Sequence, residues 1–303
     1  GLAALGFSVP AANALLSNAA SAQLPPPAEG VPFTGTGAEV LVETLRAAGV
    51  RYIFGTTSTG MSAFFDALTL RPDPQMILSL AESQATSMAQ GYELATNRPS
   101  VLIVPGVAVP STMNNLYNAW KDRSSILVLA DGTSTYFEGR NGFQQMDNWL
   151  ESMVAFTKWR WELRNERQIA EMIRRGLKVA QTPPGGPVHV RMSLDLLGMK
   201  NVKQTIYPQE RFNVPLEMQP KPELIEEAAR WLIEAKSPLL CAGAEVTRAG
   251  ATDDLIALAE LTGASVAQGY SVYSDFPFRN PLFAGFYGLG LPRDLAKTDL
   301  FMN

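Results

Sequence analysis

The residue best placed to do acid–base chemistry is Glu82. It follows a short apolar run, and its neighbours on both sides are apolar or small: Leu78, Leu80, Ala81, Ala85, Met88 and Ala89. A carboxylate in such surroundings, at the start of a helical segment, could share a proton with a bound base. Glu82 could instead be an ordinary first-turn glutamate that balances the helix dipole. The pattern alone leaves both interpretations open.

Glu82 belongs to one of four segments that directly follow apolar runs. These segments are residues 55–60, 81–83, 105–110 and 131–133. In a parallel α/β sheet, ligands bind at the carboxyl ends of the strands, which is where such segments lie. We therefore expect the functional site to form from them.

Histidine and cysteine offer little further chemistry. His189 is the single histidine of these 303 residues, which excludes a metal site or an acid–base relay built on two imidazoles. It lies in an alternating apolar run, and we expect a structural or surface role for it. Cys241 is the single cysteine, so an internal disulfide is excluded, and its apolar neighbours predict a small buried side chain.

Amphipathic helices alternate with short apolar runs along the sequence. Helical spacing is evident over residues 36–45, and residues 82–96 predict a long Ala-rich helix. Residues 100–104 and 125–130 are apolar runs typical of strands covered on both faces. The alternation predicts an α/β fold with a parallel sheet. Residues 133–161 are expected to be irregular.

The domain organisation follows from these patterns. We expect a first α/β domain over residues 34–197, a proline-containing linker over 198–221, and a second α/β domain over 222–303. The second stretch has roughly 80 residues, which is short for an open α/β domain and predicts an incomplete one. The 25 basic and 29 acidic residues include no basic block, which argues against nucleic-acid binding.

Residues 1–30 are set apart from the fold. They are small and apolar, their first charged residue is Glu29, and Ala20-Ser21-Ala22 is a small-x-small sequence followed by a stiff Pro25-Pro26-Pro27 spacer. This pattern is typical of a signal peptide whose beginning is missing, and it predicts export to the periplasm. The alternatives are a disordered Ala-rich tail on a cytoplasmic protein and a membrane-spanning helix, which Pro10 and the polar Asn13, Ser17 and Asn18 disfavour.

The run 79–99 resembles a known signature. It is similar to the pyrimidine-domain motif of thiamine-diphosphate-dependent enzymes, in which a glutamate precedes a helix that ends in Gly-Tyr-Ala-Arg-Ala-Thr-Gly-Arg-Pro. The resemblance continues in the family's order through residues 116–120, 126–130, 142–145 and 184–188, and residues 222–303 are similar to the first part of the family's central domain. Acetolactate synthase-like and benzoylformate decarboxylase-like enzymes are the most similar groups.

The resemblance implies roles for three residues. Glu82 would hydrogen-bond a ring nitrogen of the aminopyrimidine and so activate the cofactor, which would act on the carbonyl of a 2-oxo acid. Thr59 matches a hydroxyl residue that contacts cofactor and substrate in decarboxylase-like relatives, and Gln144 matches a substrate-side glutamine in synthase-like ones. Both could equally be ordinary loop residues. The implied activity is that of a carboligase or decarboxylase, a lyase or transferase.

The resemblance also implies cofactors and partners. The family holds Mg²⁺ and the diphosphate on a Gly-Asp-Gly…Asn segment of a C-terminal domain, which we expect outside these 303 residues, so that this chain would be inactive alone. FAD is a further cofactor of some relatives, near residues 285–290. The family's glutamate acts across a subunit interface, which predicts a homodimer or tetramer.

Some positions depart from the family pattern. Ala81 stands where a histidine is common, residues 104–106 lack an imidazole, and residues 107–112 replace a glycine-rich loop. These changes argue against a histidine-dependent benzoylformate-type mechanism and favour the acetolactate synthase-like group. They also leave open a noncatalytic binding or assembly protein derived from the same fold.

Overall fold

The computed structural model describes residues 29–142, 144–145, 148–212, 220–288 and 295–303. They form two compact units, one before and one after residue 216. The predicted signal peptide lies almost entirely outside the described residues. Among the residues described, no helix is long and apolar enough to span a membrane.

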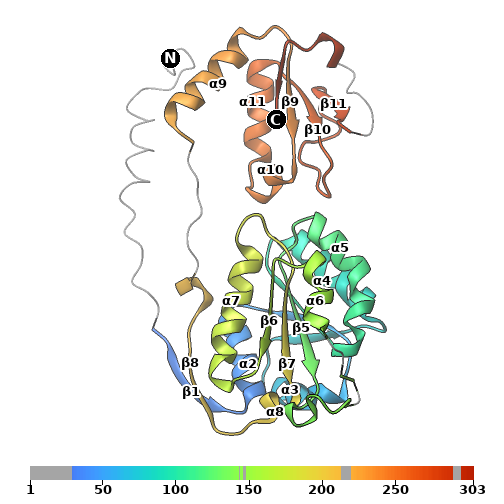
Figure 1. The fold of residues 1–303 in the computed structure, drawn as a ribbon. Coiled ribbons are helices and arrows are strands. Elements are labelled where there is room, and N and C mark those ends of the chain that lie inside the picture. Colours follow the sequence, from blue (N-terminus) through green and yellow to red (C-terminus); the bar gives the residue numbers. More distant parts are fainter. Residues whose placement is uncertain (1–28, 143, 146–147, 213–219, 289–294) are drawn as a thin grey trace. The chain divides into compact units, whose positions relative to one another are not determined.

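A six-stranded parallel sheet is the centre of the first unit (Figure 1). In spatial order its strands are β3 (Gln75–Leu78), β2 (Tyr52–Gly55), β4 (Ser100–Val104), β5 (Ile126–Gly132), β7 (Val188–Ser193) and β6 (Trp159–Leu163). The central strands β4 and β5 are buried along their whole length, as their continuous apolar sequences require. The predicted α/β fold with a parallel sheet is confirmed.

Helices cover both faces of this sheet (Figure 1). One face packs against α2 (Gly37–Ala47), α3 (Ser62–Thr69), α7 (Ile169–Gln181) and α8 (Leu194–Gly198). The other packs against α4 (Glu82–Thr96) and α5 (Met113–Lys121). Alternate residues of each strand therefore enter two separate apolar cores, with Leu127 and Leu129 in the first and Ile126 and Val128 in the second.

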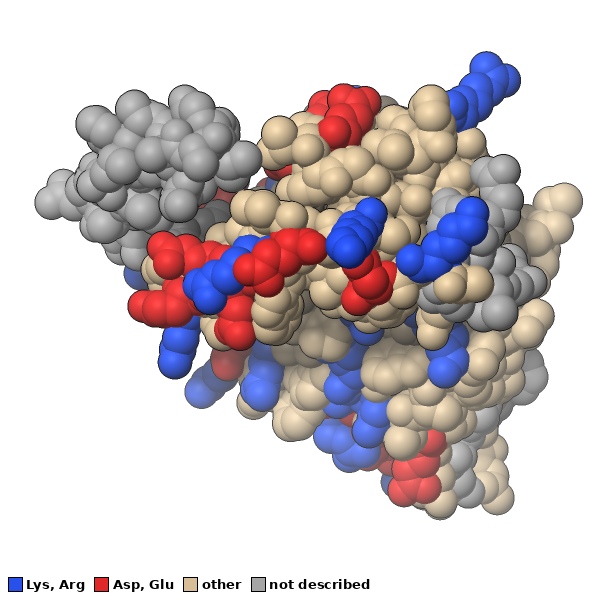
Figure 2. Space-filling model, turned by 90° about the horizontal axis from the view of Figure 1, so that it is seen from above, with Lys and Arg blue, Asp and Glu red and all other residues tan. Residues whose placement is uncertain are grey.

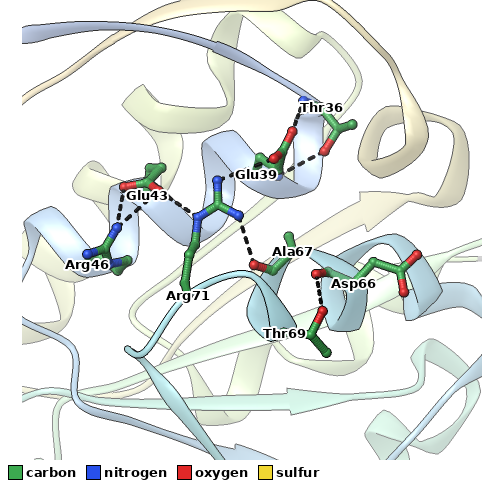
Figure 3. Close-up of polar contacts among 8 residues, drawn as sticks. All are labelled: Thr36, Glu39, Glu43, Arg46, Asp66, Ala67, Thr69 and Arg71. Atoms are coloured by element: carbon green, nitrogen blue, oxygen red, sulfur yellow. Dashed lines mark hydrogen bonds and ion pairs between the residues drawn. The ribbon is translucent and has the colours of Figure 1, made fainter.

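A polar network fixes α2 to the end of α3 (Figure 3). Thr36 and Glu39 form a reciprocal capping box at the start of α2. Arg71, just beyond α3, donates to Glu43 at 2.6 Å, to the Ala67 carbonyl at 2.9 Å and to Glu39 at 3.4 Å. The backbone N–H of Thr36 lowers the pKa of Glu39; burial opposes this shift, and Arg71 adds to it.

Two parts of this unit differ from the sequence-based expectation. The predicted linker contains a strand, β8 (Val202–Ile206), which pairs antiparallel with β1 (Val31–Gly35). Residues 133–161 are expected to be irregular, but they include the short helix α6 (Trp149–Ser152) and the beginning of edge strand β6.

The second unit contains a four-stranded parallel sheet. Its strand order is β11 (Phe283–Phe286), β10 (Ser265–Gln268), β9 (Pro238–Ala242) and β12 (Leu300–Met302). Its helices are α9 (Pro222–Glu234), α10 (Ala244–Arg248) and α11 (Thr252–Thr262). Leu240, Ala242 and Val266 form the main core with residues of α9 and α11. Cys241 alternates to the opposite side and is only half-buried, less than predicted, and burial raises the pKa of its thiol.

Charged side chains of both signs are interspersed on the face seen in Figure 2. Broad areas of uncharged residues separate them, and no extended area of a single sign covers that face. Long-range attraction of a ligand of one charge is therefore not expected there.

Candidate active site at the carboxyl ends of the first sheet

Glu82 is the first residue of α4 and directly follows the loop after β3. Its N-cap is Ala81, which offers no side-chain cap, so the carboxylate of Glu82 itself supplies negative charge at the positive end of the helix dipole. The side chain is partly exposed. The structure thus places Glu82 at the carboxyl edge of the sheet, where ligands of parallel sheets bind.

Thr56 is the polar partner of Glu82. Its hydroxyl donates to Oε1 of Glu82 at 3.0 Å, and its own backbone N–H donates to the carbonyl of Ile103 on the neighbouring strand β4. Thr56 is 8% exposed, so the side of the carboxylate that faces it lies in a largely dry environment. Among the described residues, none forms a hydrogen bond with the other oxygen, Oε2. Glu82 therefore has one oxygen held by the protein and one available to a ligand.

Thr59 and Gln144 occupy different places around this edge. Thr59 begins a short 3₁₀ turn after β2 and is exposed, one strand away from the end of β3. Gln144 lies in the segment after β5, which is three strands away from β3 in the sheet. It is partly exposed and has a left-handed φ of 68°. Among the described residues, no contact joins either side chain to Glu82.

Asp131 joins three strand ends near Thr56. Its side chain is almost completely buried, and it accepts hydrogen bonds from the Ser58 hydroxyl at 2.6 Å and from the Gly106 N–H at 2.5 Å. These three residues end or follow β5, β2 and β4. The sequence places Asp131 and Ser58 in the expected site segments, but their contact spans 73 residues and depends on the order of strands. No local sequence signal could have paired them.

Several exposed apolar side chains belong to α4 and to elements next to it. They are Leu78 (61% exposed), Leu80 (98% exposed), Met88, Val107 and Tyr117, which come from β3, the loop after it, α4, the turn after β4, and α5. We call this set the Glu82 face. Isolated exposed apolar residues are normal, but several on neighbouring elements can form a contact surface.

A cavity of about 420 Å³ lies elsewhere on the same edge of the sheet. Gln145, Glu162 and Arg191 are among its lining residues, and Glu82 and Thr59 are not. Arg191 donates to Glu162 at 2.5 Å, so a large part of the charge in this cavity is internally paired. Glu82 thus does not line this cavity.

His189 is remote from this chemistry. It is fully buried within β7, beside Val128 of β5. Burial lowers the pKa of His189 to about 4, a backbone hydrogen bond with Val128 opposes this shift, and Arg191 and Arg160 add to it. The ring is therefore neutral at pH 7, which fits the structural role expected for it. Among the described residues, no cluster of His, Cys, Asp or Glu could hold a metal ion.

Two family models match the sequence. Residues 35–151 match the model described as thiamine pyrophosphate enzyme, N-terminal TPP binding domain, and residues 225–300 match thiamine pyrophosphate enzyme, central domain. Together the two ranges include more than half of the chain, and the first contains Glu82, Thr56, Thr59 and Asp131.

Relatives with similar sequences are synthases and transferases. The chain is 28% identical over 263 residues to the acetolactate synthase large subunit assigned in Methanocaldococcus jannaschii, covering 84% of this chain and 43% of that protein. It is 29% identical over 264 residues to a sulfoacetaldehyde acetyltransferase of Alcaligenes xylosoxydans xylosoxydans, covering 82% and 40%. The chain therefore spans about half the length of the curated relatives it matches.

Solved structures share the fold. A thiamin diphosphate-dependent enzyme isolated from Mycobacterium smegmatis superposes with a TM-score of 0.79 at 25% identity, covering 89% of this chain and 52% of that one. The 4-hydroxybenzoylformate decarboxylase of Rhodococcus jostii RHA1 gives a TM-score of 0.74 at 24% identity, covering 83% and 47%. The second likeness speaks for the fold alone.

Proposed function

Because the chain belongs to the thiamine pyrophosphate enzyme family, we propose that it supplies the activating glutamate, Glu82, of a carboligase or decarboxylase acting on 2-oxo acids. The observation that carries the proposal is the state of the Glu82 carboxylate. One oxygen is held by Thr56, and the other is available at the carboxyl edge of a parallel sheet. Thr59 and Gln144 remain candidate contacts of cofactor or substrate in this proposal.

The residues around Glu82 fit the aminopyrimidine half of thiamine diphosphate. A ring nitrogen needs a carboxyl partner that can share a proton, which the available oxygen of Glu82 provides. The flat apolar part of the ring needs apolar contacts, which Leu80 and Val107 of the Glu82 face can provide. The proposal assigns no residue of this chain to Mg²⁺ or to FAD.

When bound, thiamine diphosphate supplies a carbon nucleophile for the 2-oxo acid carbonyl and an electron sink for the cleavage or loss of carbon dioxide that follows. The chain's own part is narrower. Glu82 holds or accepts a proton at its available oxygen, and Thr56 keeps the carboxylate in one orientation.

The site also favours the synthase-like reaction over a histidine-assisted one. Ala81 precedes Glu82, and the single histidine is buried in the sheet with a pKa of about 4. Neither position offers an imidazole to a substrate. The sequence similarity to acetolactate synthase and sulfoacetaldehyde acetyltransferase subunits supports the same choice.

We further propose that a second subunit covers the Glu82 face. Leu80 is 98% exposed beside a group that needs a dry site, which is unfavourable unless another surface covers it. Among the exposed positions of α4, Ser87, Gly91 and Ala95 are small, and a Cβ atom on Gly91 would meet open space. A helix of another subunit can therefore approach α4 closely, which supports a homodimer or a tetramer built from dimers.

The test is Glu82→Gln in the complete protein that the gene encodes, loaded with thiamine diphosphate and Mg²⁺. The measurement is the rate at which the thiazolium C2 proton of the bound cofactor exchanges with D₂O, followed by NMR. We expect exchange to slow by about 100-fold or more, since general acid–base partners contribute about 10²–10⁴-fold. Cofactor binding and thermal unfolding should change little.

Glu171→Gln is the matched control. Glu171 is also in the first turn of a helix, α7, but it is exposed and lies on the other face of the sheet. The control should exchange at the parental rate. Parental exchange in Glu82→Gln, or a complete protein that does not bind thiamine diphosphate, would overturn the proposal and favour the noncatalytic alternative.

A further inference from the structure

We propose that Asp131 is a positioning residue for Glu82 and that it acts through the loop 56–60. This inference rests on the proposed function, because it assigns Asp131 a role in the activity of Glu82. Asp131 does not contact Glu82. It fixes the loop that carries Thr56, and Thr56 is the side chain that orients the carboxylate.

The first step is the connection between Asp131 and the loop. The two oxygens of one buried carboxylate have different donors: Ser58 binds Oδ2 and Gly106 binds Oδ1. Ser58 in turn accepts from the N–H of Gly60, which fixes the turn that follows. A carboxylate with charge-assisted bonds to two strand ends holds them more firmly than neutral groups would.

The second step is the tight packing around Asp131. A Cβ atom on Gly60 would lie 2.1 Å from Oδ2 of Asp131, and one on Gly106 would lie 2.3 Å from its backbone oxygen. Both loops therefore lie directly against Asp131, and only glycine permits this approach. The two hydrogen bonds of Asp131 therefore act on loops that are already packed against it.

The third step leads from the loop to Glu82. Thr56 is fixed on one side by its backbone bond to Ile103, and two residues later Ser58 is fixed by Asp131. With both ends of this short segment held, the Thr56 hydroxyl has a defined direction toward Glu82. Loss of the Asp131 contact frees the second end, and the carboxylate then samples more orientations. Small misplacements of reacting groups are costly in rate.

The experiment compares Asp131→Asn and Ser58→Ala in the complete protein. Asparagine keeps the shape of Asp131 but has only one acceptor oxygen, and alanine removes the Ser58 donor. We expect either change to slow C2-proton exchange of bound thiamine diphosphate by about tenfold. Ser58→Thr, which keeps the hydroxyl, should restore the parental rate. In the cofactor-free protein, backbone amides of residues 56–61 should exchange with D₂O faster in both deleterious variants.

Asp195→Asn is the matched control. Asp195 also accepts two hydrogen bonds, from the N–H and hydroxyl of Thr135, and neither donor belongs to the loop 56–60. This variant removes a comparable interaction, and it should leave the amide exchange of residues 56–61 and the C2-proton exchange unchanged. A merely structural effect on stability would be common to both aspartate variants.

Thr56→Val decides whether Asp131 acts through Thr56. In the Thr56→Val protein, Asp131→Asn should cause no additional slowing of C2-proton exchange, because both changes interrupt the same chain of contacts from Asp131 to Glu82. A parental rate in Asp131→Asn, or an undiminished effect of Asp131→Asn on top of Thr56→Val, would overturn the inference. Failure of Glu82→Gln to slow exchange would instead overturn the proposed function, so the two failures are distinguishable.

Discussion

At the scale of single residues, His189 gives the chain a defined sensitivity to acid. Its folded pKa of about 4 lies below the ordinary value of 6.5, because burial penalises the charged ring. As pH falls from 6.5, the unfolded chain binds a proton that the folded chain does not. The stability is therefore complete above pH 6.5 and decreases down to about pH 4.

We expect the free energy of unfolding to fall by about 2 kcal/mol between pH 7 and pH 5 because of this one residue. Urea denaturation at the two pH values measures it. The variant His189→Asn should lose most of this dependence. Glu39 and Asp195 have lowered pKa values, but their effects begin only as pH falls below their ordinary values of 4.5 and 3.8. Equal losses in parent and variant would contradict the assignment.

The sequence identifies some residues of the candidate site and cannot identify others. Glu82 is recognisable because its neighbours and its helix start are local features, and the structure places it where they indicate. Its partner Thr56 is 26 residues away, and the Ser58–Asp131 pair is separated by 73. Such contacts depend on which strands are neighbours in the sheet. The roles of Glu82, Thr59 and Gln144 stay predictions.

At the scale of elements, Arg71 joins helices that have few other polar contacts to one another. Its side chain is only 10% exposed, and it faces two glutamates of α2. Replacement by methionine leaves the partly buried Glu39 without its cation and Glu43 with Arg46 alone. We expect Arg71→Met to lower the free energy of unfolding by about 2 kcal/mol, measured by urea denaturation.

Arg46→Met is the control for that change. Arg46 pairs with Glu43 as well, but its side chain is 37% exposed and lies on the same helix. Solvent screening should limit its effect to about 0.5 kcal/mol. If both variants lost the same stability, the link between α2 and α3 would not be the cause.

Local sequence signals predict some elements better than others. The helix predicted over Glu82–Thr96 and the strand predicted over Ser100–Val104 are confirmed at both ends. Each has a composition that decides its structure locally, with many helix-forming residues in one and β-branched apolar residues in the other. Strands β1 and β8 are largely or partly exposed, so neither has a strong local apolar pattern. They form by pairing with each other, although they lie at opposite ends of the unit's sequence.

At the scale of the whole molecule, the proposed self-association through the Glu82 face can be tested by substitution. We expect Leu80→Asp to weaken self-association of the complete protein by about tenfold or more, because a charge would enter a desolvated interface. Sedimentation velocity over a concentration series measures this. The monomer should keep its stability, since Leu80 is 98% exposed within one chain.

Leu70→Asp is the appropriate control for that prediction. Leu70 is 74% exposed at the end of α3, away from the Glu82 face. It should leave self-association unchanged. A protein that is monomeric at every concentration would show that no second copy covers the Glu82 face. An unchanged association constant in Leu80→Asp would show that the chains associate through another surface.

The pairing of β1 with β8 has a consequence for the synthesis of this protein. Val31 lies opposite Ile206, so the first strand of the unit pairs with its last. On a ribosome that adds about 5–20 residues per second, β1 waits roughly 10–35 s for its partner. Throughout that interval β1 of the nascent chain lacks its partner strand. We therefore expect chaperones that bind emerging chains to associate with it until residue 206 has left the exit tunnel.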